Sequence, residues 1–176
     1  MARTHKTMIV TGASQGIGAG VVKAFQDRGY SVVANSRNIN KSGAFEVSDK
    51  LALVDGNIAD SAIAAKIAEV AKMKFGSIDA LVNNAGIFFS KPFTDYTIDD
   101  LRSLCSVNIE GFFFMTQLAI KQMLAQKTGG SIVNITSKLV EHPIAGQNCA
   151  VAMITKGGLE AVTVAWRWST RRRAYA

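Results

Sequence analysis

Short apolar runs alternate with longer segments of helical period along most of the chain. Runs bounded by turn residues predict five strands, at 7–11, 31–35, 51–54, 78–82 and 131–136. Segments with apolar residues on one side predict helices at 17–28, between an N-cap at Asp60 and a stop at Gly76, at 97–125, and from about 152 onward. Strands that alternate with helices of this length form βαβ units, so we expect a parallel sheet with helices on both faces.

The predicted fold class is therefore α/β, with a doubly wound parallel sheet in a three-layer α/β/α arrangement and one domain. Hydrophobic residues make up 48% of the chain and charged residues 19%, which is typical of a globular protein. The longest apolar stretch, 109–120, is interrupted by polar residues, so we interpret it as a buried helix and expect no membrane partner. The polar segment 1–7 is not a signal peptide.

The cysteines and histidines are few and scattered. Cys105 and Cys149 have no paired or metal-type spacing, and the histidines are only His5 and His142. We therefore expect no metal site. Two free thiols without an export signal favour a reducing cytoplasm.

The formal charge of +7 raises the question of a nucleic-acid partner, because basic proteins bind phosphate backbones. Four of the arginines lie among the last eleven residues, and without them the charge falls to +3. These are Arg167, Arg171, Arg172 and Arg173. Because a charge of +3 spread over the remaining surface is typical of an ordinary globular protein, we expect no nucleic-acid partner.

A glycine-rich turn lies between the first strand and the first helix, with the spacing G-x-x-x-G-x-G. Gly12 permits the tight turn, Gly16 lets the backbone approach a phosphate, and Gly18 lets the helix pack closely on the strand. The helix N-terminus offers free N–H groups and a positive dipole end to a pyrophosphate. The sequence thus predicts a dinucleotide-binding loop made of Gly12, Ser14, Gln15, Gly16, Ile17 and Gly18.

A second motif, Asn83-Asn84-Ala85-Gly86, directly follows the fourth strand. The two motifs together resemble those of the short-chain dehydrogenases/reductases, and the similarity continues through Asn108 to the fifth strand before Ser137. The similarity covers about residues 5–165, and within the family the chain resembles 3-oxoacyl-[acyl-carrier-protein] reductase-like members. The resemblance implies a Rossmann-type oxidoreductase that forms a homo-oligomer, with Asn84, Ala85 and Gly86 beside the adenosine ribose.

The end of the second strand indicates which nicotinamide cofactor is bound. An NAD enzyme usually has a carboxylate there for the ribose 2′-OH, whereas this chain has Ser36 followed by Arg37. Arginine can pair with a 2′-phosphate, so the sequence favours NADP(H), with NAD(H) possible. Asn57 and Ile58 occupy the place where the resemblance implies contact with adenine.

The resemblance also implies a catalytic set for hydride transfer to or from a small carbonyl or alcohol substrate. Such a reaction changes the charge on oxygen, which the site must stabilise while it moves a proton. Ser137 matches the serine that hydrogen-bonds the carbonyl, and Lys156 matches the lysine that holds the nicotinamide ribose. Asn108 matches the asparagine that fixes a water in the proton relay.

The chain departs from the family at one catalytic position. The pattern Tyr-x-x-x-Lys places its tyrosine four residues before Lys156, where this chain has Ala152. Alanine cannot donate a proton, and a general acid typically contributes about 10²–10⁴-fold to the rate. Three explanations stay open: a nucleotide-binding homologue without catalysis, another acid such as His142 or an ordered water, or a replacement confined to this chain.

Residues 166–176 form a basic tail that does not resemble the family. With one choice of codons, a single-base shift after Ala165 turns these residues into Leu-Ala-Leu-Glu-Tyr-Ala-Lys-Thr-Gly-Ile-Arg, which resembles the family's continuation of the last helix. We therefore expect an incomplete NADP(H)-binding domain at 1–165 followed by a frameshifted tail, with a natural basic tail as the alternative. The sheet is then truncated after the fifth strand and the helix that follows, which leaves an open edge and impairs oligomerisation.

Overall fold

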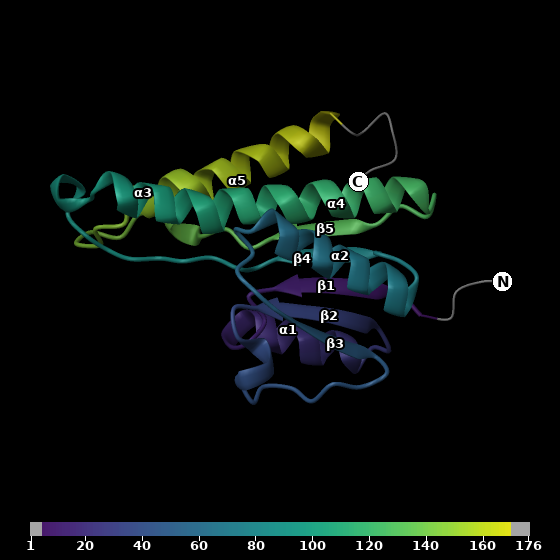
Figure 1. The fold of residues 1–176 in the computed structure, drawn as a ribbon. Coiled ribbons are helices and arrows are strands. Elements are labelled where there is room, and N and C mark those ends of the chain that lie inside the picture. Colours follow the sequence, from purple (N-terminus) through teal and green to yellow (C-terminus); the bar gives the residue numbers. More distant parts are fainter. Residues whose placement is uncertain (1–4, 170–176) are drawn as a thin grey trace.

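The fold is built on one parallel sheet. The computed structural model describes residues 5–169, with side chains described to Trp166. Its strands are β1 (Thr7–Thr11), β2 (Ser31–Ser36), β3 (Leu51–Asp55), β4 (Ala80–Asn83) and β5 (Ser131–Asn134). They pair in the order β3-β2-β1-β4-β5, with every ladder parallel (Figure 1). The predicted Rossmann-type α/β sheet is confirmed.

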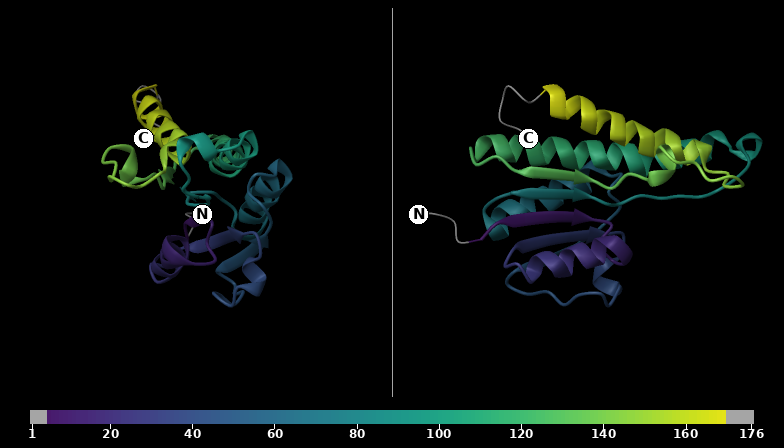
Figure 2. Two further views of the ribbon diagram at one scale, coloured as in Figure 1. Left: turned by 90° about the vertical axis from the view of Figure 1, so that its left-hand side faces the viewer. Right: turned by 180° about the vertical axis from the view of Figure 1, so that it is seen from behind.

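Helices cover both faces of this sheet (Figure 2). On one face lies α1 (Gly16–Gln26), and on the other lie α2 (Ser61–Phe75) and α4 (Gly111–Ala125). Successive side chains of a strand point to opposite faces, so Ile9 packs with α2 and α4 while Val10 packs with α1. This double burial explains why β1 consists of apolar residues between two threonines.

The helix between β3 and β4 begins and ends where its sequence predicts. The Asp60 carboxylate accepts a hydrogen bond from the Ala62 backbone N–H at 2.8 Å, which caps the first turn of α2. Gly76 ends the helix with a φ of 80°, a left-handed conformation that favours glycine. These caps orient α2 against the sheet.

The long helix predicted at 97–125 is one continuous rod with a wider turn inside it. Its parts are α3 (Ile98–Cys105), a π-helical turn at Ser106–Glu110, and α4. Its length and apolar composition would suit a membrane span, and one third of its most apolar window is buried in the protein (33%). Because Met115 packs in the core against the sheet, we interpret the rod as a core helix.

The last helix lies at one end of the sheet. α5 (Ala150–Ser169) begins two residues before the predicted start and packs against α3 and the π-helical turn. The sequence pattern of the family is expected to end at Ala165, and the helix continues past that residue. Residues 170–176 of the expected tail lie outside the described residues.

The β5 edge is the least covered part of the sheet. Within residues 5–169, β5 pairs only with β4, and Val133 is 50% exposed. A cleft of about 720 Å³ opens beside it, with Met8, Val82 and Ile135 among its apolar lining residues. The expected open edge is thus present, with apolar surface next to it.

Candidate cofactor-binding and catalytic site

A cleft of about 430 Å³ lies at the carboxyl ends of the strands. It opens where β1 separates β2 from β4, which is the switch point at which doubly wound sheets bind nucleotides. All but two of the predicted cofactor residues line it. They are Gly12, Ser14, Gln15, Gly16, Ile17, Ser36, Arg37, Asn57, Ile58, Asn84, Ala85 and Gly86.

The N-terminus of α1 is shaped to receive a phosphate. No side chain caps its first turn, whereas α2 is capped by Asp60 and α3 by Thr97. A Cβ added to Gly16 would meet no atom within 4 Å, so the backbone there faces open space. Uncapped N–H groups beside such space fit a pyrophosphate, which would take up their hydrogen bonds and the positive dipole end.

Gly18 acts behind the cleft and does not line it. A Cβ at this position would overlap the Gly12 carbonyl oxygen and lie 2.6 Å from the Asn84 side-chain nitrogen. Its role is therefore the one that the motif predicts, close packing of α1 on the loop.

The two sequence motifs are fastened to each other. The Thr11 hydroxyl accepts hydrogen bonds from the backbone N–H groups of Asn84 and Ala85, at 3.1 and 3.0 Å. In return, the Asn84 amide donates to the carbonyls of Thr11 and Gly12, at 3.0 and 2.9 Å. Because β1 and β4 are neighbours in the sheet, segments far apart in the sequence meet here and hold the glycine-rich loop in one conformation.

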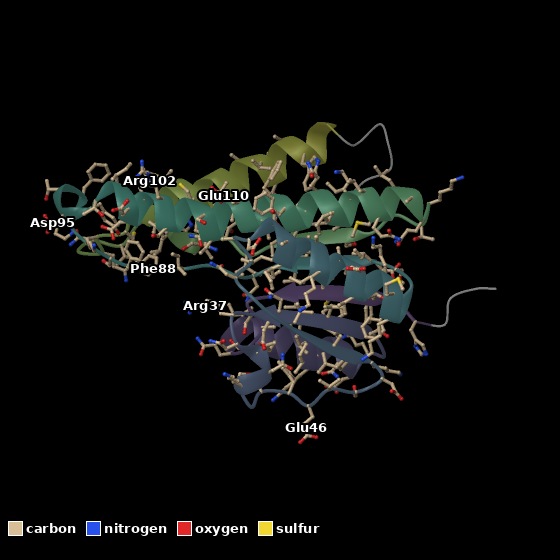
Figure 3. The ribbon with its side chains drawn as sticks, viewed as in Figure 1. Arg37, Glu46, Phe88, Asp95, Arg102 and Glu110 are labelled. Carbon is tan, nitrogen blue, oxygen red and sulfur yellow. The ribbon has the colours of Figure 1, made fainter. Side chains whose placement is uncertain are left out.

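The other end of the cleft is formed by the ends of β2 and β3. Arg37 is exposed and follows Ser36 directly at this rim (Figure 3). Beneath it, the buried Asn35 amide donates to the carbonyls of Val54 and Gly56, at 2.9 and 3.1 Å. Sequence reasoning missed Asn35, because an asparagine inside an apolar run has no motif of its own.

Asn108 is buried in the π-helical turn and joins three segments. Its side-chain oxygen accepts from the Ile87 N–H at 2.8 Å, and its amide donates to the Ile87 carbonyl and the Thr155 hydroxyl, both at 3.0 Å. It thereby fixes the chain after β4 against α5. Sequence reasoning also missed Thr155, which precedes the lysine and is fully buried.

Lys156 lies between the cleft and this network. Its ammonium donates to the Ile135 carbonyl at 2.8 Å, and burial lowers the pKa of Lys156 below its usual range. A Cβ on Gly86 would lie 3.3 Å from the lysine nitrogen and 3.1 Å from the Asn108 oxygen. Gly86 lines the cleft, so Lys156 and Asn108 stand directly behind its wall.

Ser137 follows β5 and is half-buried. Its side chain accepts a hydrogen bond from the Leu139 N–H at 3.3 Å, which caps a short 3₁₀ turn. Neither Ser137 nor Lys156 is among the residues that line the 430 Å³ cleft, although Lys156 adjoins Gly86 in its wall.

Ala152 is enclosed in apolar side chains and only 1% exposed. It packs in a cluster with Leu104 and Val151, against which Ile87 and Phe89 also pack. The position of the family tyrosine is therefore filled by neighbouring side chains. The alternative acid, His142, is exposed on the loop before α5.

The aromatic residues after β4 divide into two groups. Phe88 and Phe93 are mostly exposed, at 56% and 70%, and so do not belong to the core. Phe89 stacks on Tyr96 with ring centroids 5.9 Å apart. Exposed aromatic side chains of this kind suit contact with an apolar ligand.

The fold and the cleft define the class of protein: a Rossmann-type α/β protein with a dinucleotide-binding site. Residues 6–173 match the family described as short chain dehydrogenase, and the chain belongs to that family.

Two curated relatives in that family are similar to this chain in sequence. The chain is 35% identical over 136 residues to the NADP-dependent (R)-specific alcohol dehydrogenase of Lentilactobacillus kefiri, covering 75% of this chain and 54% of that protein. It is 34% identical over 165 residues to an uncharacterized oxidoreductase of Methylorubrum extorquens, covering 90% of this chain and 64% of the relative. The chain thus spans little more than half to two thirds of the length of these relatives.

A solved structure shares the fold closely. The 3-ketoacyl-(acyl-carrier-protein) reductase of Brucella melitensis, crystallised as a complex with NADH, superposes with a TM-score of 0.86 at 29% identity. The match covers 94% of this chain and 70% of that one.

Proposed function

We propose that this chain binds NADP(H). We also propose that the protein to which the chain belongs transfers hydride between NADP(H) and a small carbonyl or alcohol. The observation that carries the proposal is the placement of Ser36 and the exposed Arg37 on the rim of the same cleft as the uncapped N-terminus of α1. That rim offers a guanidinium, and among the residues that the structure describes no carboxylate lines the cleft. A 2′-phosphate pairs with the former and is repelled by a carboxylate.

The residues around the cleft have separate tasks in such a reaction. The bound nicotinamide supplies or accepts the hydride. The glycine-rich loop and the N-terminus of α1 would hold the pyrophosphate, and Lys156, which adjoins Gly86, would hold the nicotinamide ribose. The Ser137 hydroxyl donates a hydrogen bond to the carbonyl oxygen, and Asn108 keeps the segment after β4 fixed against α5.

A second candidate function is nucleotide binding without turnover. It is favoured by Ala152, which supplies no proton and whose surroundings are closed by apolar side chains. Under the first candidate, another acid is needed, such as the exposed His142 or an ordered water.

The setting of the protein follows from the same proposal. The partner is a small carbonyl or alcohol molecule and not a nucleic acid or a membrane. The protein acts in the cytoplasm, where reducing conditions keep Cys105 and Cys149 as free thiols. We also propose that the protein forms a homo-oligomer, as the family resemblance implies.

Titration of the chain with NADPH and with NADH, followed by nicotinamide fluorescence, tests cofactor binding. We expect saturable binding that favours NADPH, and we expect Arg37→Ala to lose about tenfold in NADPH affinity while NADH affinity is unchanged. Equal affinity for the two cofactors in the unmodified chain would contradict the NADP(H) proposal. Consumption of NADPH with a panel of ketones then separates the two candidate functions.

A further inference from the structure

Asp55, at the end of β3, forms a clamp with Asn40 outside the cleft. Its carboxylate accepts a hydrogen bond from the Asn40 backbone N–H at 3.0 Å and another from the Asn40 side-chain amide at 2.9 Å. Asp55 is paired in register with Ser36, the last residue of β2, yet it does not line the cleft. The clamp therefore joins β3 to the segment that follows Arg37.

The clamp fastens the 3₁₀ turn Ile39–Lys41, which begins two residues after Arg37. Ile39 is fully buried in the core on the α1 face, so the turn is anchored from within as well. Before Arg37, the Ser36 carbonyl accepts a hydrogen bond from the Gly56 N–H at 3.0 Å. The backbone is thus fixed on both sides of Arg37, while the arginine side chain projects at the rim (Figure 3).

The clamp also controls a negative charge near the cleft. Hydrogen bonding from the Asn40 side chain, and then from the Asn40 backbone, lowers the pKa of Asp55 and favours its charged form, which an aspartate already adopts at neutral pH. Since Asp55 stands beside Ser36, an unclamped carboxylate would lie close to the place where an NAD enzyme holds its acidic residue. In the clamp, the Asp55 carboxylate is held by Asn40 and does not line the cleft.

From this geometry we propose that Asn40 and Asp55 are positioning residues for cofactor choice: their clamp places Arg37 for a 2′-phosphate and keeps the Asp55 charge away from it. The inference rests on the proposed NADP(H) function of the cleft. It assigns the discrimination to a pair of residues that do not touch the cofactor, through preorganisation of the one that does.

The first test is Asn40→Ala in the full chain, with dissociation constants for NADPH and NADH measured by nicotinamide fluorescence. Alanine removes the side-chain hydrogen bond to Asp55 and keeps the backbone N–H bond, which loosens the turn and lets the carboxylate rotate, so we expect NADPH affinity to fall about tenfold. NADH has no 2′-phosphate, and we expect its affinity to stay within about twofold. An equal loss for both cofactors, or no loss, would overturn the proposal.

The second variant separates positioning from charge. Asp55→Ala removes the acceptor of the clamp and the negative charge together. If the clamp positions Arg37, this variant also loses NADPH affinity selectively. If the carboxylate acted only as a repelling charge, its removal would raise NADPH affinity, and that result would overturn the positioning role.

Glu46→Gln is the matched control for loss of a carboxylate. Glu46 lies exposed in the same β2–β3 connection, well apart from Arg37 (Figure 3). We expect it to leave both affinities unchanged. A chain that shows no preference for NADPH before any substitution contradicts the cofactor proposal and the clamp together, whereas a preference that survives both Asn40→Ala and Asp55→Ala contradicts the clamp alone.

Discussion

Two regions of this protein differ in how completely the chain builds them. The nucleotide half is the cleft at the ends of β1, β2 and β4, and the catalytic half comprises the predicted catalytic positions Asn108, Ser137, Ala152 and Lys156. β1 is buried along its whole length and the two motifs at its end and the end of β4 are joined by four hydrogen bonds around Thr11 and Asn84. By contrast, β5 alternates between exposed and half-buried residues, and the catalytic tyrosine position is an enclosed alanine.

The difference follows from the kind of group that each half needs. Phosphate binding uses backbone N–H groups, glycines and a helix end, which a few local segments can supply. Proton transfer needs one particular side chain, brought to one point by separate elements. One substitution at such a point, as at the family tyrosine position that Ala152 occupies, can therefore remove a proton donor without changing the segments that line the cleft.

Gly18→Ala tests the nucleotide half with the largest expected effect. The added methyl group would collide with the Gly12 carbonyl and with Asn84, so α1 must move off the loop. We expect a loss of about 3 kcal/mol in the free energy of unfolding, measured by urea denaturation. Gly20→Ala is the control: its methyl group would meet no atom within 4 Å, and inside a helix it should add about 0.5–1 kcal/mol. Equal effects of the two would show that the packing of α1 is not decisive.

Asn108→Ala tests whether the two halves are held together by one buried amide. The change leaves the Ile87 N–H and carbonyl without their partner, at a cost of about 2–3 kcal/mol in the free energy of unfolding. Because the cleft itself is fastened by Thr11 and Asn84, binding of 2′,5′-ADP to the folded variant should be unchanged. Gln117→Ala, exposed on α4, serves as the control, and weakened 2′,5′-ADP binding would mean that the halves are coupled.

Much of the fold and of the nucleotide site could be predicted from the sequence, since the signals are local. Asp60 and Gly76 delimit α2 as predicted, and the glycine spacing located a loop that lines the cleft. The carboxyl ends of neighbouring parallel strands meet by necessity, which brought Ser36 and Asn84 to one cleft.

Features that depend on packing could not be predicted in this way. The π-helical turn that presents Asn108 has no sequence mark, and the Asn40–Asp55 clamp joins residues whose contact depends on the path of a loop. The sequence shows that the family tyrosine position holds Ala152, which has no acidic group. Only the structure shows that apolar side chains enclose this position. Likewise, the exposure of Phe88 follows from the course of the loop after β4.

Ala152→Tyr tests the catalytic half directly. With the site closed by Leu104, Ile87 and Phe89, the larger side chain overpacks the cluster, and we expect a loss of about 1–2 kcal/mol in the free energy of unfolding. Carbonyl reduction should not appear from this change alone. Ala161→Tyr, the same substitution at an exposed position of α5, should be close to neutral. NADPH consumption by Ala152→Tyr with unchanged stability would show that the cluster yields and that one residue separates the halves.

Lys156→Met is expected to have the smallest effect, and its sign depends on pH. Burial lowers the pKa of Lys156 in the folded chain below the usual 10.5, so below that lowered pKa both states carry the charge and folding pays its full desolvation. Methionine removes this cost and also the hydrogen bond to Ile135, so at neutral pH we expect a net gain of less than about 1 kcal/mol.

As the pH rises through the folded pKa toward 10.5, the folded lysine loses its charge before the unfolded one does, and the burial cost disappears from the unmodified chain. The advantage of Lys156→Met over that chain must therefore shrink across this interval in urea denaturation series. Lys121→Met, exposed on α4, controls for the loss of a surface lysine. An advantage that stayed constant with pH would mean that Lys156 is solvated in the folded chain, and the wall between the nucleotide cleft and the catalytic residues would then be open to water.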